Sequence, residues 1–129
     1  MRTYPVLAML LASCTAPSST VPLEADFELT PGQTAIIAGT GQTVTFEAVA
    51  EDSRCPAGVM CVWAGNAQAR LRLGEAGRDT TVALNTGIEP RTIRLGKITL
   101  ELKAVTPAPQ AGTTTPANSY RVTLRATGT

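Results

Sequence analysis

A two-residue alternation of apolar and polar side chains runs through most of this chain and limits its fold more than any other feature. From about residue 25 onward, alternating segments are separated by turns rich in Gly, Pro and Asn, at the roughly 8–12-residue spacing typical of sandwiches and barrels. One apolar face per segment is typical of antiparallel sheets that pack on one side and face water on the other. No segment has a sustained helical period. The pattern predicts one all-β domain over residues 25–127, an antiparallel, Greek-key-like β-sandwich of about eight strands.

The alternating segments are the expected strands, and their apolar positions are the expected core. Aromatic residues make up only 4 % of the chain, so this core must be built mainly from Val, Leu, Ile and Ala. In segment 44–51 the inward positions are expected to include Ala48 and Ala50, and in segment 98–104 they are expected to include Ala104. The full set of expected strands is 26–29, 34–38, 44–51, 67–73, 80–84, 92–95, 98–104 and 120–126.

The chain contains no histidine, and this absence excludes several classes of active site. Ser-His-Asp and Cys-His catalysis, histidine general bases and most catalytic zinc sites all need that residue. A hydrolase that uses carboxylates alone is a remaining alternative, but Glu47 and Glu51 would lie about 13 Å apart along one strand, too far to act on one bond. The formal net charge is only +1, so no basic surplus favours nucleic acid or anionic lipid as a partner. We expect no enzymatic activity, no cofactor and no metal centre.

The N-terminus has the features of an export signal. Arg2 supplies a positive charge, a short apolar run follows, and the run ends in Leu-Ala-Ser-Cys at residues 11–14. The run is far shorter than the ~20 residues that a membrane-spanning helix needs. Leu-Ala-Ser-Cys resembles the lipobox of bacterial lipoproteins. The resemblance implies a signal peptide over 1–13 and a lipid anchor on Cys14, through which the protein would bind a membrane. From the residues alone, an ordinary secretory signal or a buried strand are the alternatives.

The residues after Cys14 are rich in Ser, Thr and Pro, a composition typical of a flexible tether. We therefore expect the lipidated cysteine and its tether to occupy residues 14–24. In lipoproteins of enteric-type bacteria, an aspartate directly after the cysteine retains the protein in the inner membrane. Here that position is Thr15. The resemblance therefore implies a cell-envelope location in the outer membrane where the cell has one, and otherwise in the cell membrane.

The densest chemistry of the chain lies between two expected strands, in residues 51–66. This stretch holds two of the three cysteines and the only tryptophan. An exported protein meets an oxidising compartment, so a Cys55–Cys61 disulfide is the simplest outcome once Cys14 carries lipid. Pro56 restricts φ, and Gly58 allows the positive φ that a tight reversal needs. The sequence therefore predicts a rigid, shaped loop.

Several roles for this loop stay open at the sequence level. It can be a recognition loop that presents Arg54, Val59, Met60 and Trp63 to a partner, because a rigid loop loses little entropy on binding. Arg54 can instead pair with the carboxylate of residue 51 or 52. Trp63 can instead be a core residue packed over the disulfide, which is the commoner role of tryptophan in a domain poor in aromatics. Reduced cysteines together with Met60 would suit Cu(I). The C-x5-C spacing does not favour thioredoxin-like redox chemistry. A calcium site at the carboxylates of residues 51 and 52 lacks the usual ligand loop.

The segment Asp-Ser-Arg-Cys-Pro at 52–56, followed by Cys-Val-Trp-Ala-Gly at 61–65, resembles a segment of small exported bacterial β-proteins of uncharacterised function. The resemblance implies an exported β-domain with a disulfide and carries no activity. We expect a lipid-anchored cell-envelope protein that acts as a non-catalytic binding or structural module, with an envelope protein as the partner. The alternative is an inhibitor of an envelope enzyme that acts through the Cys55–Cys61 loop.

Overall fold

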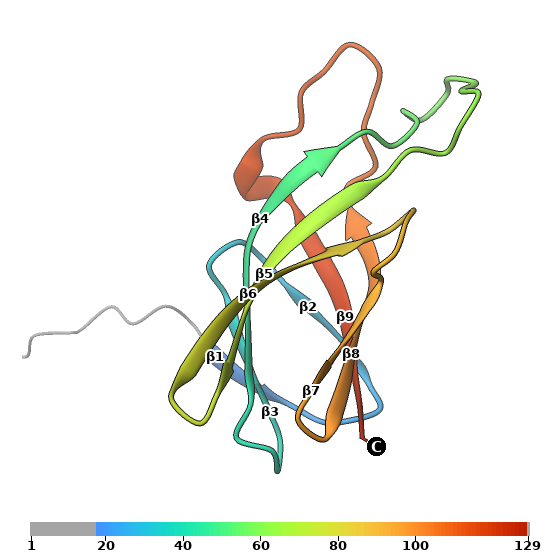
Figure 1. Cartoon of the computed structure of the whole chain (residues 1–129). Helices are drawn as coiled ribbons and strands as arrows, with labels where there is room; N and C mark the ends of the chain where they lie inside the picture. The colour runs from blue at the N-terminus through green and yellow to red at the C-terminus, as the bar shows by residue number, and fades with distance from the viewer. Residues whose placement is uncertain (1–17, 129) are drawn as a thin grey trace, which may run out of the picture.

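The computed structural model describes residues 18–128, which form two β-sheets packed face to face (Figure 1). The predicted all-β sandwich is confirmed, with nine strands in the described residues instead of about eight. The five-stranded sheet has the order β1 (Ser18–Val21), β3 (Thr34–Ile37), β4 (Thr43–Asp52), β5 (Ala67–Glu75), β6 (Arg78–Asn85). The four-stranded sheet has the order β2 (Asp26–Leu29), β9 (Arg121–Gly128), β8 (Ile98–Thr106), β7 (Thr92–Leu95).

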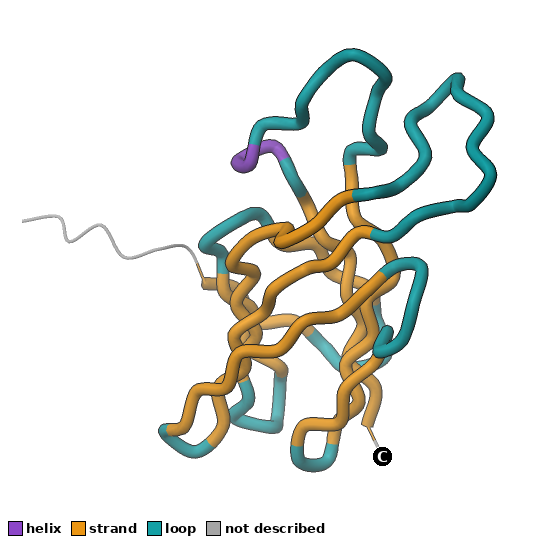
Figure 2. The backbone as a smooth tube through the Cα atoms, turned by 45° about the horizontal axis from the view of Figure 1, so that its top comes forward, coloured by secondary structure: helices purple, strands orange, loops and turns teal. Residues whose placement is uncertain are grey.

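The connectivity places the two longest loops at one end of the sandwich. Strands β3 to β6 and strands β7 to β9 each form an antiparallel meander, and β2 pairs with β9. The β4–β5 loop, residues 53–66, and the β8–β9 loop, residues 107–120, project side by side from the same end, although they belong to different sheets (Figures 1 and 2). The second loop contains the only short helix of residues 18–128, η1 (Ala117–Ser119).

The core lies between the sheets and follows from the period-two pattern. In β5, Ala67, Ala69, Leu71 and Leu73 point inward and are buried, while the residues between them are half-buried or exposed. Phe46 is the largest fully buried side chain in the described residues, and aliphatic residues make up most of the rest. The other large, fully buried side chains are Leu29, Ile37, Leu84, Ile98, Leu100, Leu102, Leu124, Val44 and Val122.

The predicted inward positions at the ends of β4 and β8 are wrong. The β4–β5 register shifts between Phe46 and Ala48 and again between Val49 and Glu51, so Ala50 is exposed and Val49 packs against the core instead. A β-bulge adds an unpaired residue and thereby exchanges the two faces of a strand beyond it. A shift between Leu102 and Ala104 in β8 has the same effect, burying Val105 in place of Ala104.

The tether predicted over residues 14–24 differs from the structure at its C-terminal part. Residues Ser18–Val21 form β1, which runs parallel to β3 and is the one parallel pair among the named strands of residues 18–128. Val21 is buried, its carbonyl accepts a hydrogen bond from the Ala38 amide at 2.9 Å, and the Glu24 amide donates to the Ala126 carbonyl at 2.8 Å. The edge of β3 provides backbone partners for this segment, which composition alone does not reveal.

The predicted signal peptide and the lipid anchor at Cys14 lie outside the described residues and stay predictions. The part of the chain that the structure describes holds no helix with the length and hydropathy of a membrane span.

Candidate functional site: a braced disulfide loop

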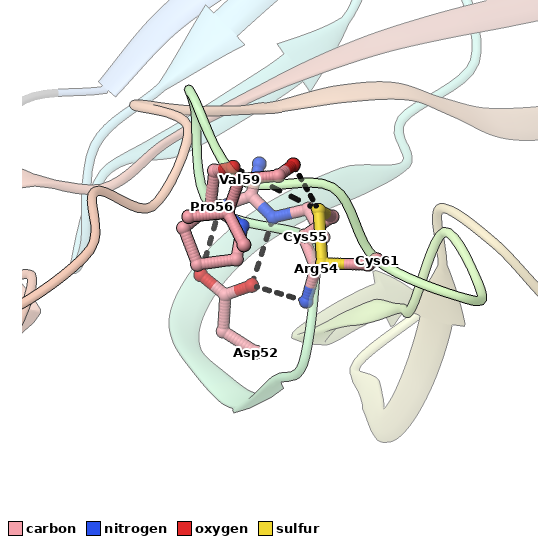
Figure 3. The surroundings of a disulfide bond; sticks show 6 residues. All are labelled: Asp52, Arg54, Cys55, Pro56, Val59 and Cys61. Atoms are coloured by element: carbon pink, nitrogen blue, oxygen red, sulfur yellow. Dashed lines mark hydrogen bonds and ion pairs between the residues drawn. A yellow bond between two sulfur atoms is a disulfide. The ribbon is translucent and has the colours of Figure 1, made fainter.

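The disulfide predicted in the β4–β5 loop is confirmed. Cys55 and Cys61 are bonded, with their Cα atoms 5.8 Å apart (Figure 3). Inside the ring, the Val59 amide donates to the Pro56 carbonyl at 3.2 Å, which closes a turn around Gly58. Gly58 has a φ of +80°, the left-handed conformation that its position predicted.

Hydrogen bonds between the two arms of the loop close its base. The Ser53 amide donates to the Asn66 carbonyl at 2.7 Å, and the Asn66 amide donates to the Ser53 hydroxyl at 3.0 Å. Higher in the loop, the Cys55 amide donates to the Ala64 carbonyl at 3.1 Å. Gly65 lies so close to the opposite arm that a Cβ atom there would stand 1.9 Å from the Ser53 carbonyl oxygen. The two arms therefore leave the sheet as a tightly packed pair.

Arg54 pairs with Asp52, which is the alternative to outward presentation that the sequence left open. Its Nε and Nη2 atoms donate to the two carboxylate oxygens of Asp52, each at 2.8 Å, and its side chain is only 15 % exposed (Figure 3). The same guanidinium reaches across to the end of β8 and the loop after it, where it donates to the carbonyls of Val105 and Pro107, the latter at 2.9 Å. A bidentate pair with Asp52 and five fixed donors make arginine suited to this bridging position.

Tyr120 completes the contact from the second loop. Its hydroxyl donates to Asp52 Oδ2 at 2.9 Å, so the Asp52 carboxylate is held by groups from both loops. We call Asp52, Arg54 and Tyr120 the brace. The chain separates Asp52 from Tyr120 by 68 positions, and nothing in the sequence links them.

The charges of the brace stabilise one another. The hydrogen bond from Arg54 lowers the pKa of the Asp52 carboxyl below its ordinary value, and this effect outweighs the opposing effect of burial. The pKa of Arg54 is raised, chiefly by the same bond. Burial raises the pKa of the Tyr120 hydroxyl, and its hydrogen bond to the ionised Asp52 adds to this shift. The brace is thus an ion pair plus a neutral phenol at pH 7, an arrangement suited to holding two loops together.

Backbone contacts join the two loops further out. The Ala57 amide donates to the Pro109 carbonyl at 2.9 Å, and Ala57 forms a parallel bridge with Gln110. The β4–β5 loop is therefore fixed at its base, at the brace and near its far end.

The outer part of the loop exposes apolar side chains to water. Met60 is 100 % exposed, Val62 95 %, Trp63 72 % and Val59 44 %. We call these four residues the tip. Trp63 is thus exposed, as the recognition-loop interpretation expects, and the alternative that it packs in the core over the disulfide is wrong. Residues 61–63 do not continue a strand, and the closed disulfide ring carries them away from the sheets. Val62 was not among the predicted binding residues, although it is almost fully exposed.

The loop offers little to a metal ion. Among residues 18–128, no group of three or more Cys, Asp or Glu side chains could hold one. The disulfide removes the two thiolates that the Cu(I) alternative requires. The calcium alternative loses a carboxylate because Asp52 is engaged by Arg54.

Comparison with protein-family models, curated proteins and solved structures gives no match to this chain.

Proposed function

We propose that this chain is a lipid-anchored cell-envelope protein without catalytic activity, which binds a partner protein by inserting the tip into an apolar cleft. The observation that carries this proposal is the exposure of Val59, Met60, Val62 and Trp63 on a loop that is fixed in shape. Scattered surface apolar residues need no explanation, but four within five positions of one loop form a patch of the kind that marks interaction sites.

The energetics favour a docking role. Fully burying a Met or Val side chain contributes about 1.5–3 kcal/mol, and tryptophan is among the residues that most often dominate binding energy. The disulfide, the closed base and the brace fix the backbone before binding, so little conformational entropy is lost when the tip is buried. A purely structural role would not require these side chains to stand in water.

A protein cleft fits the tip better than a lipid surface does. Residues 55–66 contain no Lys or Arg that would attract anionic lipid headgroups. A fluid bilayer also accepts an apolar side chain from a flexible loop as readily as from a rigid one, whereas a cleft of fixed shape requires a loop of fixed shape. The three attachments of the loop therefore support a protein as the occupant.

Inhibition of an envelope enzyme is the second candidate function. The convex, disulfide-closed ring supports it, because a preorganised loop that fills an enzyme's cleft can block access to substrate. The absence of charge in residues 55–66 points to an enzyme whose cleft is apolar.

Site-specific photo-crosslinking in cells tests the proposed function with the full chain. A photoreactive amino acid replaces Val62 in the tip, and a control protein carries it at Thr81, an exposed residue of β6. We expect a discrete protein adduct from position 62 only, and a weaker adduct when Trp63→Ser is added. Equal adducts from both positions, or adducts with lipid alone, would overturn the proposal. Membrane fractionation of Cys14→Ser tests the anchor separately, and full membrane retention of that variant would contradict it.

A further inference from the structure

Apart from Arg54, which is paired with Asp52 in the brace, the two loops at the tip-bearing end of the sandwich carry no charged side chains. Residues 55–66 and residues 107–120 contain no Asp, Glu, Lys or Arg, so all 10 acidic and 11 basic residues of the chain lie elsewhere. The second loop is rich in Thr, Pro and Ala, and most of it is exposed. It also forms a shallow hollow of about 260 Å³, lined by residues that include Pro107, Ala108, Thr113, Pro116 and Ser119.

The two loops are joined as one unit. Arg54 donates to the Pro107 carbonyl at 2.9 Å, Ala57 donates to the Pro109 carbonyl at 2.9 Å, and Tyr120 donates to Asp52 at 2.9 Å. Figure 2 shows both loops rising from the same end of the two sheets. A partner that receives the tip from this direction therefore meets the second loop as well.

The tip alone is too small for a stable interface. Stable complexes bury about 800 Å² on each partner, whereas one aromatic side chain contributes at most ~250 Å². Trp63 with Met60 and two valines falls short of that area. The exposed part of residues 107–120 is the adjoining surface that can supply the remainder.

We propose that the docking surface is composite and consists of the tip together with the loop 107–120, and that its partner presents an uncharged, apolar cleft with hydroxyl or amide groups at the rim. This inference rests on the proposed function and adds the second loop and the chemistry of the partner. A charged group on the partner would lose its hydration on docking and find no unpaired counter-charge in residues 55–66 or 107–120, which is unfavourable by several kcal/mol. The lack of charge thus selects against charged clefts.

The composite surface is tested by a second photo-crosslinking position in the full chain. The photoreactive amino acid is placed at Ala111, an exposed turn residue of the second loop, and the adduct is identified by mass spectrometry. We expect positions 111 and 62 to capture the same protein. Capture from position 62 alone would overturn the composite surface and leave the proposed function standing. If neither position 111 nor position 62 captures a protein, both the composite surface and the proposed function are overturned.

A charge substitution gives a second, independent readout. With the photoreactive residue at position 62, Ala111→Arg should reduce the yield of the protein adduct roughly tenfold, because the added charge is desolvated without a partner. Thr81→Arg, on exposed β6, should leave the yield unchanged. In membranes from the same cells, raising the salt concentration should not reduce the yield, since no charge pairs are screened. Equal yields with Ala111→Arg and Thr81→Arg, or a strong loss in high salt, would contradict the inference.

Discussion

Replacing Arg54 by methionine should lower the free energy of unfolding by about 2–3 kcal/mol. Hydrogen bonds to charged groups contribute about 1.5–3 kcal/mol each, and breaking a fully buried ion pair costs about 3–5 kcal/mol. Arg54 and Asp52 have side chains 15 % and 11 % exposed, so water can partly replace the lost contacts, and the exposed Pro107 carbonyl can be hydrated as well. Methionine keeps the apolar stem. For a domain of this size, the change corresponds to a fall in Tm of roughly 8–12 °C.

The measurement is urea unfolding at pH 7, with a matched control from the surface of the same sheet. Arg70 pairs with Glu47 at 3.2 Å, but the two side chains are 49 % and 26 % exposed. Arg70→Met should therefore change the free energy of unfolding by less than ~1 kcal/mol. If Arg54→Met and Arg70→Met were equally mild, the brace would be no stronger than an ordinary surface pair, and the account of how the two loops are held would be refuted.

The same variant should also change the response to acid. The pKa of the Asp52 carboxyl is lowered in the folded state from its ordinary 3.8, so the unfolded chain takes up the proton first. The stabilisation by Arg54 is thus fully present above about pH 5 and is lost as the pH falls through the folded pKa. Urea midpoints measured between pH 7 and pH 2 should show wild type and Arg54→Met converging at the acid end. A constant difference down to pH 2 would contradict the assignment of the stabilisation to this ion pair.

The remaining predictions concern the loop itself. Gly65→Ala should lower the urea midpoint strongly because its Cβ would collide with the Ser53 carbonyl, whereas Gly58→Ala, with nothing within 4 Å, should cost only ~1–2 kcal/mol of backbone strain. Trp63→Ser should change the free energy of unfolding by less than ~0.5 kcal/mol, and acrylamide should quench the Trp63 fluorescence almost as well as free tryptophan; a core tryptophan would cost about 3–5 kcal/mol. Peroxide oxidation of Met60 to the sulfoxide should leave the urea midpoint unchanged and abolish the position-62 adduct, and a Met60→Leu protein should keep that adduct after the same treatment.

The sequence predicts the sandwich well because burial enforces the period of two. A strand such as β5 keeps one unbroken alternation, and each of its apolar positions is buried as expected. The errors occur where alternation is interrupted by backbone geometry. The shifts after Phe46 and Leu102 leave no mark in the residue types, since Ala48, Ala50 and Ala104 are small enough for either face.

The candidate site was less predictable because its contacts link distant parts of the chain. The disulfide and the left-handed Gly58 follow from local chemistry, and both are present. The pair of Arg54 with Asp52 joins close neighbours in the sequence. The other contacts of the brace come from the carbonyls of Val105 and Pro107 and from the Tyr120 hydroxyl, in β8 and the β8–β9 loop, and no local pattern encodes them. Trp63 is exposed because those contacts hold the loop outside the core. The scarcity of aromatic residues in the chain had favoured a buried tryptophan.

Strand β1 limits how far from the membrane the tip can lie if the proposed anchor is present, and this limit bears on the choice of partner. If Cys14 carries the lipid, four residue steps lie between it and Ser18, and they span at most about 14 Å. A tether that extended to residue 24 would have allowed more than twice that distance. Ser18 is paired with Thr34 of β3, which is in turn paired with Thr45 of β4. From Thr45, strand β4 runs about 23 Å to Asp52, and the tip lies beyond that end. With the proposed anchor on Cys14, the tip would be confined to a layer on the order of 50 Å above the bilayer. Such confinement would raise the effective concentration of the tip toward proteins in or on the same membrane, so that a modest apolar contact would suffice for these partners and would be too weak for partners free in solution.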